Sequence, residues 1–286
     1  MAVKQFKPIK AVSEELGFED LTYPVSVSIK HDGVNGLNLK GDFLGRSLKA
    51  MKNVWLTQKL SQEKFEGICG EICHATLDDG ELKLNRQDLC RATTSMTGAI
   101  KKENFEFIWV LFDYIKDGSE EYCSNTPFVD RMYQLAELLM GMDGLDYAGV
   151  TVLCGIQYHV FNVDGVCMLM PEAVEVNSPE ELEELHNNFV DNGFEGTITR
   201  SPQGVYKFGR STAKSQEIVR FKPKGDSEII VTKFEPMFKN NNEAKINELG
   251  HTERSSHKEN KEQLDMVGAL IGIDVNTGEL TKVSAG

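Results

Sequence analysis

The segment 25–33, which reads Val-Ser-Val-Ser-Ile-Lys-His-Asp-Gly, constrains the fold of this chain more than any other. Apolar and polar residues alternate as far as Ile29, so we expect a β-strand with one face in the core and the other lining a polar pocket. A glycine turn at Gly33 follows, and it sets the amine of Lys30 at the end of the strand beside the carboxylate of Asp32. The segment predicts either a nucleophilic lysine at a strand end or an ordinary hairpin turn with an exposed lysine.

Helix and strand patterns are mixed along the rest of the chain and predict an α+β fold. Helix-start signals, a cap followed by proline at the first helical position, occur at Thr126-Pro127 and at Ser178-Pro179. Residues with strand-like patterns lie at 37–40, 67–74, 107–115, 150–153, 196–200, 219–222 and 228–234.

The chain is long enough for two domains. Its 286 residues exceed a typical single core, and the composition changes after Gly225-Asp226. Residues 239–263 are polar, and the apolar segments 266–273 and 280–283 flank a turn at 276–278. We therefore expect a large domain over residues 1–225 and a small β-domain over residues 226–286, built as strand, long loop, strand and hairpin.

The composition excludes several classes. No apolar run reaches the roughly 20 residues that span a bilayer, and the first residues lack the apolar segment of a signal peptide, so we expect a soluble cytoplasmic protein without a membrane partner. The six cysteines contain no CxxC pair, which argues against a disulfide framework or a zinc site. Cys69 and Cys73 are therefore expected to be small buried side chains.

Charge is distributed unevenly. The formal net charge of −13 argues against a general polyanion binder. However, residues 201–224 carry six cations and a single acid, Glu217. This segment predicts a locally basic cleft that handles phosphates.

Five further motifs follow the lysine segment in order. They are Gly-Arg-Ser at 45–47, Gly-Glu-Ile at 70–72, Leu-Phe-Asp-Tyr at 111–114, Glu-Gly-Thr-Ile-Thr-Arg at 195–200 and Phe-Lys-Pro-Lys at 221–224. From about Pro24 to the C-terminus, the series resembles the lysine-adenylating nucleotidyltransferases, and specifically the ATP-dependent DNA ligases of the small bacteriophage type. The resemblance implies an adenylation domain with mixed and antiparallel sheets, of ATP-grasp-like character, followed by an oligonucleotide-binding (OB-fold) barrel.

The second domain looks short for that barrel. About 60 residues follow the boundary, and the family's last basic motif, which orients the leaving group of ATP, has no counterpart. We expect an incomplete barrel, and we expect self-adenylation to be impaired more than the sealing of a nick that already carries AMP.

The resemblance implies a reaction at Lys30. This amine would take AMP from ATP, release diphosphate and pass AMP to the 5′-phosphate of a nick in duplex DNA, from which a 3′-hydroxyl displaces it. The amine must first lose its proton, and Lys222, Lys224 and Mg²⁺ (or Mn²⁺) are the groups that would lower its pKa. Lys222 and Lys224 lie two apart, so on a strand both would reach the α-phosphate. Glu195, together with Asp32, would hold the metal.

The resemblance also assigns the contacts of the nucleotide and of DNA. Glu71 would accept a hydrogen bond from the ribose, Phe112 would stack on adenine, and Ile29, Asp32 and Asn35 would complete the ATP site. Residues expected to contact nucleic acid are Arg46 (also near the nucleotide), Ser47, Arg91 and Arg210. The family has arginine where this chain has Asn35, which supplies no charge.

Several alternatives remain. An RNA ligase uses the same lysine chemistry, and it is mainly residues 210–212 and 251–256 that favour the phage DNA enzymes over it. A capping guanylyltransferase is disfavoured by the same segments. An NAD-dependent ligase is disfavoured because 29 residues precede Lys30 and zinc cysteines are missing. An inactive nick-binding protein would explain Asn35, but it would not need Lys30, Glu71, Glu195, Lys222 and Lys224 together. The leading hypothesis is a monomeric enzyme that acts in DNA repair or replication, in the cytoplasm of the bacterial host if a phage encodes it.

Overall fold

The structure is a computed structural model that describes residues 5–75, 77–78, 81–85, 88–223, 227–248 and 250–285. It divides into two compact units, Met1–Pro223 and Lys224–Gly286, and each is described by itself. The predicted phosphate contact Lys224 lies outside the described residues.

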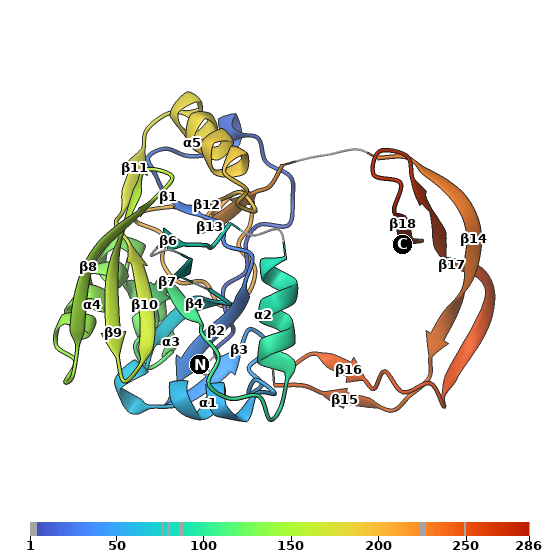
Figure 1. The fold of residues 1–286 in the computed structure, drawn as a ribbon, viewed down its shortest axis with the longest axis horizontal. Coiled ribbons are helices and arrows are strands. Elements are labelled where there is room, and N and C mark those ends of the chain that lie inside the picture. Colours follow the sequence, from blue (N-terminus) through green and yellow to red (C-terminus); the bar gives the residue numbers. More distant parts are fainter. Residues whose placement is uncertain are drawn as a thin grey trace. The chain divides into compact units, whose positions relative to one another are not determined.

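The larger unit contains a seven-stranded sheet with the strand order β3-β2-β4-β7-β10-β9-β8 (Figure 1). Neighbouring strands are antiparallel, except that β7 and β10 are parallel. The strand bounds are β2 Val34–Leu39, β3 Asp42–Gly45, β4 Ile68–Cys73, β7 Ile108–Tyr114, β8 Asp146–Leu153, β9 Ile156–Val163 and β10 Val166–Pro171.

A second, four-stranded sheet has the order β11-β1-β12-β13 and is antiparallel throughout. Its strands are β1 Val25–Ile29, β11 Val174–Val176, β12 Thr197–Arg200 and β13 Ile218–Phe221. The predicted strand at 25–29 is confirmed, and its apolar residues Val25, Val27 and Ile29 are buried. β1 is therefore a central strand whose far end leads directly into Lys30.

Five helices belong to the described part of the larger unit: α1 Val54–Leu60, α2 Leu89–Gly98, α3 Glu120–Asn125, α4 Phe128–Met140 and α5 Pro179–Asp191. Short 3₁₀ turns lie at Phe18–Asp20 and Glu63–Phe65, and a small hairpin joins β5 Leu77–Asp78 to β6 Glu81–Leu82. The predicted start of α5 is confirmed: the Ser178 side chain accepts a hydrogen bond from the amide of Glu181.

Helices cover both sheets. Leu135 and Leu139 of α4 pack with Trp109 and Leu111 on one face of the seven-stranded sheet. α5 covers the four-stranded sheet, where His186 is hydrogen-bonded to the Thr197 hydroxyl at 2.9 Å. Burying the apolar stripe of each helix against a sheet face is the main stabilising term of such layers. Cys69 and Cys73 are free and buried, as predicted.

The smaller unit is an open antiparallel sheet of β14 Ile229–Asn240, β17 Lys261–Asp274 and β18 Leu280–Ser284, in the order β14-β17-β18. The predicted long loop at 239–263 is wrong in part: it contains the hairpin β15 Ala244–Ile246 and β16 Thr252–Arg254, and both long strands extend into it. Pairing with a neighbour supplies these polar residues with backbone hydrogen bonds, which outweighs their weak β-propensity. Within the described residues the sheet does not close into a barrel.

The structure confirms the mixed α+β class that the sequence predicts.

Candidate active site

Lys30 lies at the first position after β1, where the two antiparallel strands β1 and β12 meet at one end. Its backbone amide donates a hydrogen bond to the carbonyl oxygen of Gly196 at 2.9 Å. Its side chain forms an ion pair with Glu195, and both side chains are 19% exposed. The predicted nucleophile is therefore held in a partly shielded site and not on an open turn.

Glu195 binds two lysines at once. One carboxylate oxygen, Oε2, pairs with Lys30, and the other, Oε1, pairs with Lys222, which follows the end of β13. Burial by itself raises the pKa of Glu195, but hydrogen bonds from Lys222 and Lys30 outweigh that effect and hold the pKa below its ordinary value. Glu195 is therefore a carboxylate at neutral pH.

A glycine makes this convergence possible. Gly196 has a φ of +137°, and a Cβ at this position would overlap the carbonyl oxygen of Phe221. Only glycine lets the start of β12 approach the end of β13 so closely. This approach brings Lys222 to Glu195.

Asp32 lies beside Glu195. Burial, together with the negative charge of Glu195, raises the pKa of Asp32, although Lys30 and Lys222 oppose the shift. Two adjacent carboxylates repel one another and favour a cation between or beside them. Within the described residues no group of three or more His, Cys, Asp or Glu side chains is arranged to hold a metal. Proteins usually bind Mg²⁺ through only one or two carboxylates, together with phosphate oxygens of the substrate. The pair Glu195 and Asp32 nevertheless fits this pattern.

Glu71 of β4 lies directly opposite Asn35 of β2 in the pairing of these two strands. Burial is the main cause that raises the pKa of Glu71 to about 7, against the opposing charges of Lys30 and Arg46. The Oδ1 atom of Asn35 is buried and has no hydrogen-bond partner within the described part of the chain. This pair therefore offers oxygen acceptors that a bound molecule with hydroxyl groups would satisfy.

The residue between Lys30 and Asp32 faces the interior. His31 packs edge-on against Tyr158 and Phe194, and its Nε2 lies 3.2 Å from the Tyr158 hydroxyl. Burial and the charge of Lys30 lower the pKa of His31 to about 3, so its ring is neutral. His31 thus anchors the loop that carries Lys30 in the core.

A buried ion cluster beside Phe112 was missed by sequence reasoning. Asp113, which is 0% exposed, receives hydrogen bonds from Arg131 at 2.7 and 3.1 Å and from Arg200 at 2.8 Å. Burial would raise the pKa of Asp113, but the two guanidinium groups outweigh it and hold the pKa low. The guanidinium carbon of Arg200 lies 5.7 Å from the centre of the Phe112 ring, so the cluster also packs against that ring. The sequence signal that could have revealed this cluster was an aspartate inside an apolar strand, because a buried carboxylate requires a partner.

The other predicted site residues lie outside the cluster around Lys30 and Glu195. Arg46 follows β3 and is exposed, but its charge reaches Glu71, and Ser47 beside it is exposed too. Arg91 is exposed on α2. Arg210 is exposed and donates a hydrogen bond to the carbonyl oxygen of Ala11 at 2.8 Å. The structure therefore brings together Lys30, Asp32, Asn35, Glu71, Glu195 and Lys222.

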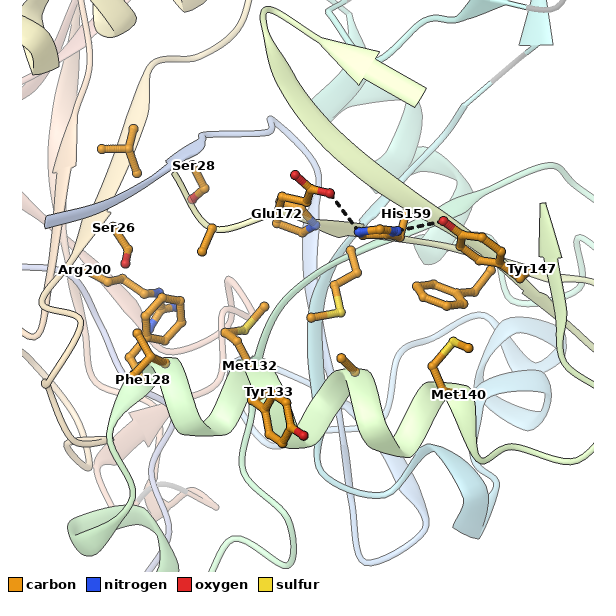
Figure 2. Close-up of a pocket in the computed structure, with 17 residues that line it drawn as sticks. Ser26, Ser28, Phe128, Met132, Tyr133, Met140, Tyr147, His159, Glu172 and Arg200 are labelled. Carbon is orange, nitrogen blue, oxygen red and sulfur yellow. Dashed lines mark hydrogen bonds and ion pairs between the residues drawn. The ribbon is translucent and has the colours of Figure 1, made fainter. Parts of the chain in front are cut away.

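The polar face of β1 differs from its prediction. Ser26 and Ser28 line a cavity of about 530 Å³, but most of its other lining residues are apolar, among them Met132, Phe161 and Met170 (Figure 2). The expectation of a polar pocket is therefore wrong along this part of the strand, because α4, β9 and β10 supply side chains that the local alternation cannot reveal.

Comparisons with known proteins give a clear result for the fold. No family model matches the chain, and no curated protein matches it. Among solved structures, a DNA ligase–adenylate of Chlorella virus matches with a TM-score of 0.55 at 24% identity, over 98% of this chain and 82% of that one. A second structure of Chlorella virus DNA ligase–adenylate matches with a TM-score of 0.55 at 21% identity, over 99% of this chain and 85% of that one. A Lig E DNA ligase matches with a TM-score of 0.54 at 15% identity, over 98% of this chain and 84% of that one.

The chain thus has the fold of the DNA ligases. The resemblance to DNA ligases predicted from the ordered motifs is thereby confirmed at the level of the fold.

Across the part of the chain that the structure describes, no helix has the length and apolar character needed to cross a membrane.

Proposed function

We propose that this protein is an ATP-dependent DNA ligase that seals nicks between a 3′-hydroxyl and a 5′-phosphate in duplex DNA, through a covalent adenylate on Lys30. The observation that carries the proposal is the convergence of Lys30 and Lys222 on Glu195. Two amines and a carboxylate at one partly shielded point suit nucleophilic attack on a phosphate followed by transfer of the nucleotide.

In the first step the Lys30 ammonium loses one proton to solvent, the neutral amine attacks the α-phosphorus of ATP, and the nitrogen releases a second proton to solvent as the new bond forms. The nitrogen–phosphorus bond forms, the bond from the α-phosphorus to the bridging oxygen breaks, and diphosphate leaves. Lys222 stabilises the negative charge that develops on the α-phosphate oxygens, and Lys224 is proposed to join it. Glu195 and Asp32 would hold Mg²⁺ (or Mn²⁺), which supplies positive charge beside the phosphates.

The paired side chains of Glu71 and Asn35 indicate how the nucleoside would be held. A ribose hydroxyl donating to Glu71 would satisfy a carboxyl group whose raised pKa reflects its burial, and a second hydroxyl suits the unpartnered Oδ1 of Asn35. Phe112 is proposed to stack on the adenine. The side chain of Ile29 is buried in the core, so only its backbone is proposed to contact the nucleotide. An amide at position 35 contributes no positive charge, so a charged contact to the 5′-phosphate must come from another residue, for which Arg46 is our candidate.

In the later steps the adenylate passes to the 5′-phosphate of the nick, and the 3′-hydroxyl then displaces AMP. We propose residues 1–225 as the adenylation domain and residues 226–286 as part of an OB-fold domain, with Arg46, Ser47, Arg91 and Arg210 as DNA contacts. The protein would act as a monomer on nicked duplex DNA in repair or replication, in the cytoplasm of a bacterial host in the case of a phage-encoded enzyme.

One observation favours a second candidate. Asn35 stands where the family has arginine, and this substitution suits a catalytically impaired protein that binds nicks without sealing them. RNA ligase is a further alternative, because it shares the lysyl-adenylate chemistry.

The test is intact-protein mass spectrometry after incubation with ATP and Mg²⁺, followed by sealing assays on nicked DNA and nicked RNA duplexes. We expect a gain of one AMP that is absent from Lys30→Ala and retained in Lys101→Ala, a control at an exposed lysine. We also expect faster sealing of nicked DNA. Faster sealing of RNA would favour RNA ligase. Failure to seal even a nick that already carries AMP would favour the impaired nick-binding protein.

A further inference from the structure

A cavity of about 530 Å³ lies between α4, the strands β8 to β10 and the serine face of β1 (Figure 2). Its lining residues include neither Lys30 nor any other residue assigned above to ATP, metal or DNA. The volume lies within the range of pockets that hold small organic molecules. The cavity is therefore a candidate site in its own right.

The walls of the cavity suit an aromatic ring. Met132 and Met140 of α4 lie on one side, and Phe161 and Met170 of the seven-stranded sheet line it as well. Methionine side chains adapt to the shape of a ring and make favourable sulfur–aromatic contacts. A surface of this kind binds a flat apolar ring system most favourably.

One end of the cavity carries surplus positive charge. Arg200 lines it, yet is only 4% exposed. Arg200 and Arg131 both pair with the same carboxylate, Asp113. Two guanidinium groups share one carboxylate, so this cluster keeps one positive charge more than Asp113 neutralises. A buried charge of this kind binds an anionic group strongly, because little water competes for it.

Hydroxyl groups lie at the same end. Ser26 is directly opposite Arg200 in the pairing of β1 with β12, and Ser28 lies on the same face of β1. Figure 2 shows Ser26, Ser28 and Arg200 together on one side of the cavity. An anionic group that reaches Arg200 would therefore meet additional hydrogen-bond donors.

A carboxylate also lines the cavity, between Ser28 and Tyr147 in the view of Figure 2. Glu172 lies 3.1 Å from Nε2 of His159, and the other ring nitrogen, Nδ1, is hydrogen-bonded to the Tyr147 hydroxyl at 2.9 Å. Glu172 is 42% exposed and so lies near solvent. Its charge disfavours a second anionic group there, which fixes the orientation of a ligand that carries only one.

We propose that this cavity binds a flat aromatic molecule with a single anionic group, with its rings among the methionines of α4 and the anionic group at Arg200. Ser28 and Lys30 share β1 and its extension, so the ligand would contact the strand that presents the proposed nucleophile. The proposal does not rest on ligase activity.

The test uses two dyes with the same ring pair: 1-anilinonaphthalene-8-sulfonate, which is anionic, and N-phenyl-1-naphthylamine, which lacks the sulfonate. Fluorescence titration of the protein alone, without ATP or DNA, gives both dissociation constants. We expect the anionic dye to bind at least fivefold more tightly. Raising the salt concentration should change this difference in affinity little, because salt screens a buried charge only weakly.

A cavity-filling variant tests the location. Ala136 lines the cavity from α4, so Ala136→Trp should weaken binding of the anionic dye at least tenfold. Glu137→Trp adds the same side chain at the next, exposed position and should change binding less than twofold. Both variants keep the exposed apolar residues of the smaller unit, so dye binding there would be equal in the two. Equal binding by the two variants, or equal affinity for the two dyes in the unaltered protein, would overturn the proposal. The comparison of dyes remains decisive if Ala136→Trp fails to fold.

Discussion

Lys30 makes two contacts with the dipeptide Glu195-Gly196. The amide of Lys30 donates to the carbonyl oxygen of Gly196 at 2.9 Å, next to Glu195, and the amine of Lys30 pairs with the Glu195 carboxylate. The backbone bond extends the antiparallel ladder of β1 and β12 by one residue, so the side chains are held together by the sheet. The position of the proposed nucleophile is thus a property of strand register.

The carboxylate of Glu195 should be essential to the first chemical step. We expect Glu195→Gln to slow self-adenylation by about 10²–10³-fold, because it removes the charge that pairs with both lysines and that we propose holds the metal. Glu175→Gln, at an exposed position of β11, is the matched control. The measurement is the rate of AMP incorporation by mass spectrometry. A rate within threefold of the unaltered protein would contradict the assigned role.

The raised pKa of Glu71 predicts a pH-dependent stability. The folded protein holds a proton on Glu71 up to about pH 7, whereas the ordinary pKa of the group is 4.5. Stability from this group is therefore complete below pH 4.5 and is lost as the pH rises toward 7, by on the order of 1–3 kcal/mol. Urea unfolding at pH 5 and pH 8 should show a smaller difference between the two pH values in Glu71→Gln than in the unaltered protein. The same difference in both proteins would argue against this protonation.

Removing the central carboxylate of the buried cluster should be costly. Asp113→Asn leaves Arg131 and Arg200 without their shared charge partner, and we expect a loss of about 3–5 kcal/mol in the free energy of unfolding. Asp130→Asn, at an exposed position in the first turn of α4, should cost much less. Urea denaturation of the two variants provides the comparison. A loss below about 1 kcal/mol for Asp113→Asn would mean that the two arginines find other partners.

Gly196 should not tolerate a side chain. Its φ of +137° and the overlap of a Cβ with the Phe221 carbonyl oxygen predict that Gly196→Ala costs about 1–3 kcal/mol. It should also slow self-adenylation, because the start of β12 must move away from Lys222. Gly98→Ala is the control, since no atom lies within 4 Å of a Cβ at the end of α2. Thermal melts and AMP incorporation measure the two effects. A fully stable and active Gly196→Ala would show that the close approach is dispensable.

Much of the site could be predicted because its motifs are short and local. Alternation at 25–29 located β1, and the glycine-containing motifs located Glu71 within a strand and Glu195 just before one. The partners of Asp113 could not be predicted in this way. Arg131 is on a helix and Arg200 on a strand of another sheet, and no period in the sequence relates them to Asp113.

The sequence by itself determined the strand and helix segments of the larger unit that carry strong local signals, the capping of α5, the burial of Cys69 and Cys73 and the ordered residues that resemble ligases. These depend on side-chain periodicity and on contacts within a few residues. Only the tertiary structure decided which groups meet: Lys30 and Lys222 on Glu195, two arginines on Asp113, and an apolar cavity behind the serine face of β1. The physical reason is that periodicity specifies which face of a strand is buried, whereas the neighbour that buries it is set by sheet order and register across residues far apart in the chain.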